Sequence, residues 1–357
     1  MKTWTAPFAA AACAVGLVVT TGSAGAATDD PLRDKLYGLD QVHAEQAWSS
    51  SRGAGTVVAV VDTGVDLGHP DLQGRLVPGA DFVCGEQKGS CGDGSWKGQD
   101  GVGQESDVHG THVSGTIAAN ADNGIGVAGV APEAKVMPIK VLEDGSGTNE
   151  DIAEGIRYAA DHGADVINLS LGGLPGTQIF SIFGLDTTMK DAIQYARDKG
   201  TLTVAAAGNT STLLCNDPAF SSDSICVGAT DRNELKSYFS ELPVTFRGKG
   251  VAGPGGSGRL LGGPCSDDII STVPRGTGTD ECGEGKDYAA FAGTSMATPH
   301  VAGVAAILFG QGRSLDNVEQ AILSTSRHPV FGTRGGFSAL YGRGIVDARA
   351  AVAYPRD

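Results

Sequence analysis

Short apolar runs alternate with segments of helical periodicity along this chain. Four β-branched, apolar runs predict buried strands: residues 57–62, 135–141, 165–169 and 201–206. Between them, apolar positions recur at helical spacing over 148–162 and 187–199, and Gly200 gives the second segment a C-terminal stop signal. Strands that alternate with helices in this way form a mostly parallel sheet covered on both faces. We therefore predict a doubly wound α/β fold in a single domain.

The run FAGTSMATPHVAGVAAILF, residues 291–309, predicts a helix of another kind. From Met296 onward it is apolar nearly all round, so the helix should lie inside the protein. Ser295 stands at its start, where unpaired backbone N–H groups and the helix dipole favour negative charge. Pro299 falls in the first turn, where no intrahelical donor is lost. We therefore expect Ser295 to be a nucleophile with a site for an oxyanion beside it.

A serine hydroxyl becomes a good nucleophile only when a neighbouring base takes its proton and an acid orients that base. The run VVAVVDTGVD puts Asp62 at the end of a predicted strand. The run HGTHVSGT puts His109 at the start of a predicted helix. Because active residues of such folds gather where strand ends and loops converge, we expect Asp62, His109 and Ser295 to meet there.

Three motifs carry a resemblance to a known family: DTGVD, HGTHVSGT and GTSMATPHVAG. In this order they resemble the subtilisin-like serine proteases (subtilases), and the similarity spans roughly residues 34–353. The order of aspartate, histidine and serine is the one known for subtilisin. The resemblance implies the subtilisin-like fold and a serine endopeptidase that cleaves protein or peptide substrates through a covalent acyl-enzyme.

The same resemblance implies roles for residues outside the triad. Asn209, after the strand at 201–206, matches the side-chain amide of the family's oxyanion hole. Glycine backbone can pair with an extended peptide at a sheet edge, as the substrate cleft requires. The two rims of that cleft fall on Gly145, Ser146 and Gly147, and on Ser170, Leu171 and Gly172.

The family resemblance also implies a structural Ca²⁺ site, which would stabilise the protein by binding only its folded form. The family's glutamine ligand faces Arg33, which cannot coordinate a cation, and Asp34 is the candidate substitute. The alternative is that Asp71 only caps a turn. The implied ligands are Asp71, the side chain of Asn123, and the backbone carbonyls of Ala121, Ile125 and Val127.

Residues 1–27 are typical of a secretory signal peptide, with Lys2, an apolar run over 6–19 and small residues up to Ala27. The peptidase domain then covers 28–357, with loop insertions near 83–107 and 241–286. We find no recognisable N-terminal prosegment between Thr28 and the strand that ends at Asp62. No later run has the length of a membrane span, so we expect a secreted, extracellular protein without a membrane partner.

The net charge bears on which partners this protein binds, and the cysteine content bears on the compartment in which it folds. The formal net charge of −15 repels phosphate backbones, so we expect no nucleic-acid partner. Separately from the charge, we expect a monomer. Six cysteines follow the predicted signal peptide, an even number typical of disulfides in an exported chain. Nearest neighbours bracket Gly- or Ser-rich loops, which favours the pairs 84/91, 215/226 and 265/282.

Two other functions are compatible with parts of this sequence. A non-catalytic peptide-binding protein could use the same fold, because a fold does not fix a function. A serine esterase of the α/β-hydrolase type is disfavoured, since the run from Gly293 to Ala297 lacks the second glycine of the nucleophile elbow. The histidine also precedes the serine here, whereas it follows the serine in those enzymes.

Overall fold

The computed structural model describes residues 1, 28–83, 107–143, 145–171, 187–258, 264–282 and 285–357. Four sequence predictions lie wholly or mostly outside these residues: the signal peptide, the loop insertion near 83–107, the Cys84–Cys91 pair, and Gly172 of the substrate rim.

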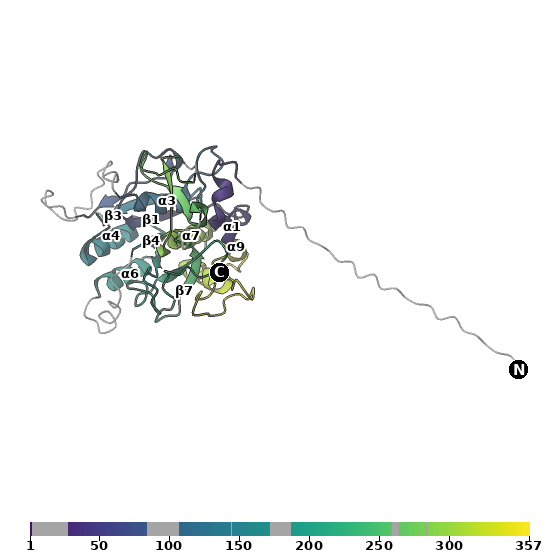
Figure 1. Ribbon diagram of the computed structural model, residues 1–357. Helices are drawn as coiled ribbons and strands as arrows, with labels where there is room; N and C mark the ends of the chain where they lie inside the picture. Colours follow the sequence, from purple (N-terminus) through teal and green to yellow (C-terminus); the bar gives the residue numbers. More distant parts are fainter. Residues whose placement is uncertain (2–27, 84–106, 144, 172–186, 259–263, 283–284) are drawn as a thin grey trace.

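In the described part of the chain, seven parallel strands form the central sheet in the order β2-β3-β1-β4-β5-β6-β7 (Figure 1). The predicted α/β fold is therefore confirmed. After β1 the chain forms β2 and β3 on one side and then β4 on the other, so the sheet has a switch point at β1 and β4. The strands are β1 (Val57–Asp62), β2 (Ala80–Asp81), β3 (Lys135–Lys140), β4 (Val166–Leu169), β5 (Leu202–Ala206), β6 (Ile225–Thr230) and β7 (Gly250–Pro254).

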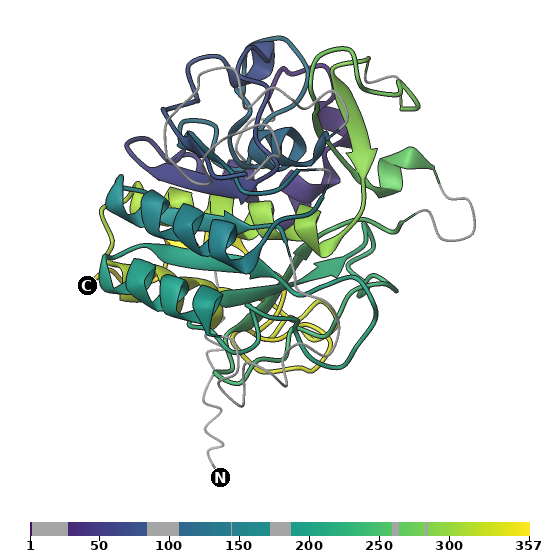
Figure 2. The ribbon, with the colours of Figure 1, turned by 90° about the vertical axis from the view of Figure 1, so that its left-hand side faces the viewer.

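Both faces of the sheet are buried, which explains why β1 is apolar along nearly its whole length. Side chains alternate between the faces of a strand. Val58 and Val60 pack in the core that contains α3 (His109–Ala118) and α7 (Thr294–Phe309). Ala59 and Val61 pack in the core formed with α4 (Asn149–Asp161) and α6 (Thr188–Asp198). Figure 2 shows α4 and α6 side by side over that face.

Helix α7 is the buried helix that the sequence predicts, and Figure 1 shows it near the centre of the body. Every residue from Met296 to Leu308 is buried. Glycine allows its neighbours to approach closely: a Cβ at Gly303 would lie 2.6 Å from Cβ of Val130. The same holds at the start of α3, where a Cβ at Gly110 would lie 2.1 Å from the carbonyl oxygen of Gly64.

The range 241–286, predicted as a loop insertion, contains two strands. Strand β7 forms an edge of the main sheet, and β8 (Ile269–Thr272) pairs antiparallel with β9 (Tyr288–Phe291). The prediction was wrong for these residues because the glycines of β7 interrupt its apolar pattern. Strands β8 and β9 are separated in sequence by residues 273–287, so no local sequence pattern predicts that they pair.

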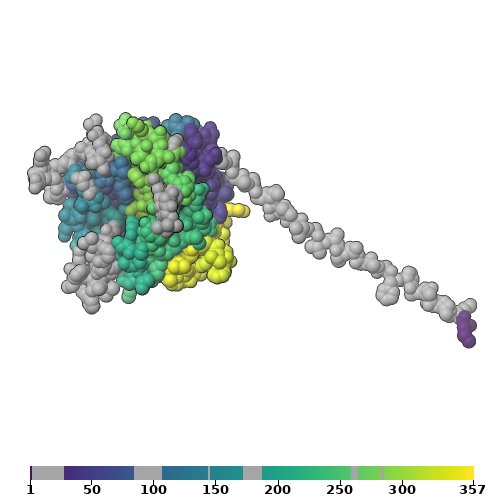
Figure 3. All heavy atoms as spheres, in the orientation of Figure 1, coloured from purple at the N-terminus to yellow at the C-terminus, as the bar shows by residue number. Residues whose placement is uncertain are grey.

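The remaining helices close the core around α7. Helix α9 (Ala348–Val352) packs on the N-terminal segment, and the Ala348 N–H donates to the Val42 carbonyl at 2.8 Å. Figure 3 shows the C-terminal residues in yellow on the same side of the body as the purple N-terminal ones. The other α-helices of the described residues are α1 (Tyr37–Gln41), α2 (Ala44–Ala47) and α8 (Leu315–Thr325), and the 3-10 helices there are η1 (Arg33–Lys35), η2 (Pro70–Leu72) and η4 (Cys265–Asp267). Within the described ranges, no helix has the length and apolarity needed to cross a bilayer.

The described residues contain two disulfides, Cys215–Cys226 and Cys265–Cys282. Both are predicted nearest-neighbour pairs, so this part of the prediction is confirmed.

Candidate active site

The structure joins Asp62 and His109, which lie 47 residues apart in the sequence. Asp62 ends β1 and is fully buried. Its Oδ1 accepts hydrogen bonds from His109 Nδ1 at 2.8 Å and from the Thr63 N–H at 2.8 Å. Thr63 also fixes the start of α3, because its hydroxyl accepts a hydrogen bond from the Gly110 N–H at 3.0 Å. The carboxylate therefore orients the imidazole through one of its ring nitrogens.

Opposing effects act on the His109 imidazole. Burial lowers its pKa, but the charge of Asp62, its hydrogen bond and the charge of Asp107 together raise the pKa above the ordinary value of 6.5. The side chain is still 30% exposed, so its other nitrogen can meet a substrate. His109 is consequently a stronger base than a free histidine, and it is neutral only above its raised pKa.

Ser295 lies in the first turn of α7, beside the end of β4. Its hydroxyl donates to the Ser170 carbonyl at 3.0 Å, and the Ser170 hydroxyl donates to the Ser295 carbonyl at 2.7 Å. In the described part of the chain, the Ser295 hydroxyl and the His109 imidazole are not hydrogen-bonded to each other. The structure thus forms two pairs, Asp62 with His109 and Ser295 with Ser170.

Asn209 follows β5 and faces the start of α7. Its Oδ1 accepts hydrogen bonds from the Thr294 N–H at 2.9 Å and from the Thr294 hydroxyl at 3.1 Å. This leaves the Nδ2 hydrogens without an acceptor in the described structure. A Cβ built on Gly293 would lie 3.6 Å from Asn209 Nδ2 and 3.6 Å from the Ser295 backbone nitrogen. Both predicted oxyanion donors therefore border the same space.

The described residues of the predicted substrate rims connect to the two pairs through Asp107 and through Ser170. Glu143 and Ser146 exchange backbone hydrogen bonds of 2.9 and 3.0 Å in a turn that gives Gly145 a φ of +74°. Asp107 joins this rim to the base, since it accepts hydrogen bonds from the Gly145 N–H at 3.2 Å and the His109 N–H at 3.4 Å. Leu171 is partly buried and follows Ser170.

Of the predicted calcium ligands, Asp71 and Val127 are buried, Ala121 is half-buried, and Asn123 and Ile125 are exposed. Asp71 is fully buried, and its oxygens accept hydrogen bonds from Asn123 Nδ2 at 2.8 Å and the Val127 N–H at 2.9 Å. Burial, with the added charge of Asp30, raises the pKa of Asp71 to about 6 although these hydrogen bonds oppose the shift. The Asp30 carboxylate is 4% exposed and accepts hydrogen bonds from the backbone N–H groups of Asp122 and Asn123.

The sequence analysis named Asp34 as the candidate substitute ligand, but the acidic side chain that bonds to the loop at 122–123 is Asp30. Arg33 instead forms ion pairs with Asp40 at 2.5 Å and Glu45 at 2.6 Å. In the described chain, neither Asp30 nor Asp71 forms an ion pair with a lysine or arginine. Two buried carboxylates without a cationic side chain suit a hard cation, so these residues fit calcium. The Asn123 amide must turn over to present its oxygen.

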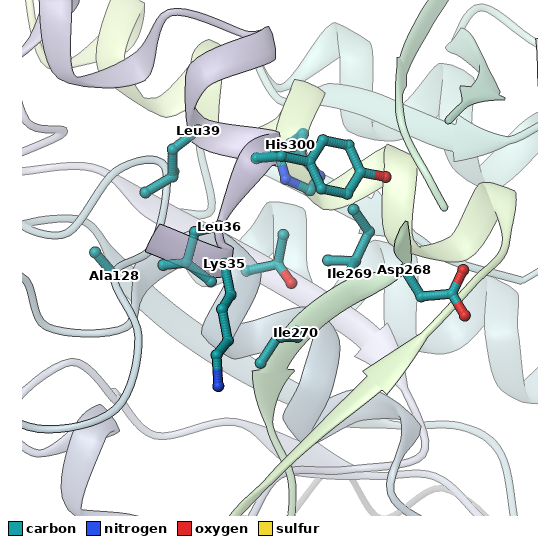
Figure 4. A pocket seen from close by; sticks show the side chains of 11 residues that line it. Lys35, Leu36, Leu39, Ala128, Asp268, Ile269, Ile270 and His300 are labelled. Carbon is teal, nitrogen blue, oxygen red and sulfur yellow. The ribbon is translucent and has the colours of Figure 1, made fainter. Parts of the chain in front are cut away.

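Figure 4 shows a pocket between the N-terminal segment, β8 and α7. His300 and Asp268 line it, and Lys35 directs its ammonium away from His300. His300 Nδ1 contacts the Met296 carbonyl at 2.8 Å, and Asp268 accepts from the Ser257 N–H at 3.0 Å. None of the predicted site residues lines this pocket.

Most of this chain is similar to known proteases. The model of the subtilase family matches residues 53–344. Thermitase from Thermoactinomyces vulgaris is 40% identical over 328 residues, 91% of this chain and 99% of that protein. The thermophilic serine proteinase of Bacillus sp. (strain AK1) is 38% identical over 320 residues, 89% of this chain and 67% of that protein.

Solved structures agree. A protease from Pseudoalteromonas arctica aligns with a TM-score of 0.71 and 32% identity, over 92% of this chain and 99% of that one. Fervidolysin from Fervidobacterium pennivorans aligns with a TM-score of 0.70 and 31% identity, over 96% of this chain and 48% of that one. Three of these four relatives are named as proteolytic enzymes, which supports a protease over a non-catalytic binding protein or an esterase.

Proposed function

This chain belongs to the subtilase family and is a subtilisin-like serine endopeptidase, and on that premise we propose that Ser295, His109 and Asp62 form its catalytic triad. The 2.8 Å contact between His109 Nδ1 and Asp62 Oδ1 is the observation that carries the proposal. It fixes the tautomer that leaves His109 Nε2 free to accept a proton.

In the proposed reaction, the Ser295 hydroxyl turns from the Ser170 carbonyl toward His109. Catalytic hydrogen bonds of this type are often loose in the free enzyme and tighten in the substrate complex. Oγ attacks the peptide carbonyl while its proton passes to Nε2 of His109. That proton then goes to the leaving amine, and water releases the acyl group by the same steps in reverse.

Asn209 Nδ2 and the Ser295 N–H are the proposed donors to the oxyanion of the tetrahedral intermediate. Both nitrogens border the space that a Cβ on Gly293 would occupy. The two hydrogen bonds from Thr294 hold the Asn209 amide in place. Donors fixed in advance stabilise developing charge without reorganising, which is why they accelerate the reaction. The rims at Gly145–Gly147 and Ser170–Gly172 are the proposed binding surfaces for the substrate backbone.

Covalent labelling tests the nucleophile. A fluorophosphonate probe applied to culture medium and to washed cells should label the folded protein at Ser295, and heat-denatured protein should stay unlabelled. The two disulfides support an oxidising compartment, so the labelled protein should appear in the medium. Labelling at another residue, or none on folded protein, would contradict the proposed nucleophile.

We further propose that Asp30, Asp71, Asn123 and the carbonyls of Ala121, Ile125 and Val127 hold a structural Ca²⁺. When bound, the ion would neutralise two buried carboxylates and join the segments at 30, 71 and 121–127. The bond from the Tyr288 hydroxyl to Asp71, at 3.3 Å, links the same site to β9.

Calcium should stabilise this protein in a pH-dependent way. Without the ion, Asp71 has a pKa of about 6 when folded, against an ordinary value of 3.8, so its ionisation destabilises the fold as pH rises between these values. The ion requires the ionised carboxylate. A calcium concentration of about 100 times Kd should therefore add about 2.7 kcal/mol of stability well above pH 6 and little well below it.

Thermal melts with calcium and with a chelator, at pH values on both sides of 6, measure this effect. Asp71→Asn should lose most of the calcium-dependent shift in Tm, whereas the exposed Asp198→Asn should keep it. An equal shift at both pH values would argue against Asp71 as a ligand.

A further inference from the structure

Glu241 is a buried carboxylate that the mechanism above does not use. It lies between β6 and β7 and is 0% exposed. Its side-chain oxygens accept hydrogen bonds from the Thr210 N–H at 3.2 Å and the Thr210 hydroxyl at 2.5 Å. The Thr212 hydroxyl and Asn216 Nδ2, the latter at 3.4 Å, are further donors. All four donors lie in residues 210–216, a segment that begins directly after Asn209.

The backbone of Glu241 contacts the residue on the other side of Asn209. Its N–H donates to the Gly208 carbonyl at 3.1 Å. Gly208 has a φ of +114°, and a Cβ there would lie 2.8 Å from Glu241 Cγ and 2.9 Å from Oε1. Next to it, the Ser211 N–H donates to the Phe239 carbonyl at 2.9 Å. Glu241 thus bonds to both residues that flank Asn209.

Stability alone does not account for a carboxylate at this position. Among the described residues, no lysine or arginine forms an ion pair with Glu241, and the nearby Lys236 donates to the Ser237 carbonyl instead. A buried charge without a cation destabilises a fold unless hydrogen bonds compensate for lost water. Hydrogen bonds to a charged acceptor are stronger than neutral ones, and here they all hold one loop.

We infer that Glu241 is a positioning residue for the oxyanion donor Asn209, an inference that rests on the proposed function. Thr294 fixes the side-chain oxygen of Asn209, and Glu241 fixes the backbone before and after it. Together, Thr294 and Glu241 direct Asn209 Nδ2 toward the space that a Cβ on Gly293 would occupy. The aim matters, because a displacement of about 1 Å can slow a reaction about 100-fold.

Glu241→Gln tests the inference with little change of shape. One acceptor oxygen becomes an NH₂ group, which cannot accept hydrogen bonds from Thr210 or Thr212. On a peptide anilide we expect kcat to fall about 10- to 100-fold and KM to change less than about twofold, because the lost interaction acts in the transition state. Affinity for a peptide aldehyde, whose tetrahedral adduct carries the oxyanion, should fall by the same factor as kcat.

Two variants serve as controls. Thr210→Val removes the hydroxyl that donates to Glu241, so it should also lower kcat. This variant tests the inference even where Glu241→Gln does not fold. Glu319→Gln removes a different buried carboxylate, one that pairs with Arg197 and Lys249. It should lower Tm and leave kcat unchanged.

A double-mutant comparison separates this inference from the proposed function. Asn209→Ala should lower kcat about 100- to 1000-fold, and Glu241→Gln should cost nothing further in that background. Unchanged kcat in folded Glu241→Gln, or an equal loss in both backgrounds, overturns the inference and leaves the triad intact. Full activity of Asn209→Ala would instead contradict the proposed oxyanion donor itself.

Discussion

Replacing Ser295 with alanine should lower kcat by about a million-fold, the size of effect measured for the triad serine of subtilisin. The reason is chemical: without the hydroxyl no acyl-enzyme can form, and only the oxyanion donors and substrate binding still act on the peptide bond. The fold should persist, because alanine is a good helix former and only the bond to the Ser170 carbonyl is lost. Hydrolysis of a protein substrate and of a peptide anilide measures the effect.

Ser326→Ala is the matched control for this variant. Ser326 is fully buried and donates to the Ile322 carbonyl at 2.7 Å, so its loss costs one hydrogen bond far from the triad in sequence. We expect a Tm change comparable to that of Ser295→Ala and full activity. Undiminished hydrolysis by folded Ser295→Ala would exclude Ser295 as the nucleophile.

Asp62→Asn should lower kcat by about 10⁴-fold. The amide keeps the shape of the carboxylate but can donate to His109 Nδ1, which favours the wrong tautomer of the imidazole. The variant also loses the charge that holds the pKa of His109 above 6.5, so that pKa should fall. Since the base must be neutral, the acid limb of the pH profile should move to lower pH.

The dependence of kcat/KM on pH for the two proteins measures this shift. Asp107→Asn provides the comparison, because Asp107 also raises the pKa of His109 but as the smallest of the contributing effects. Its acid limb should move in the same direction by a smaller amount. An acid limb that stays in place in Asp62→Asn would show that Asp62 does not set the basicity of His109.

Local pattern was enough to predict several elements of this fold. The run at 57–62 is apolar on both faces, so it can be buried with its backbone N–H and C=O groups hydrogen-bonded only inside a sheet. It forms β1. Residues 149–161 have one apolar face and form α4, with the Thr148 hydroxyl accepting from the Asp151 N–H at its start. The all-round apolar run after Met296 forms the buried α7.

Other features have no local signature. Asp30 lies at the acidic site because the N-terminal segment packs against the loop at 121–127, where the Leu32 N–H donates to the Gly126 carbonyl at 3.0 Å. Glycine-rich β7 is a strand only because β6 offers it a hydrogen-bonding edge. Glu241 is inconspicuous in sequence and becomes a candidate only through its contacts with residues 208–212.

The sequence by itself therefore determined the layered α/β fold, the family, and the residue types of the proposed triad. Those depend on periodicity and on short motifs, which a chain carries whether folded or not. Only the tertiary structure decided that Asp62 pairs with His109 and that the Ser295 hydroxyl bonds to the Ser170 carbonyl. It also decided that Glu241 bonds to the two residues on either side of Asn209. Such contacts join residues far apart in the chain, and their distances are set by how the core packs.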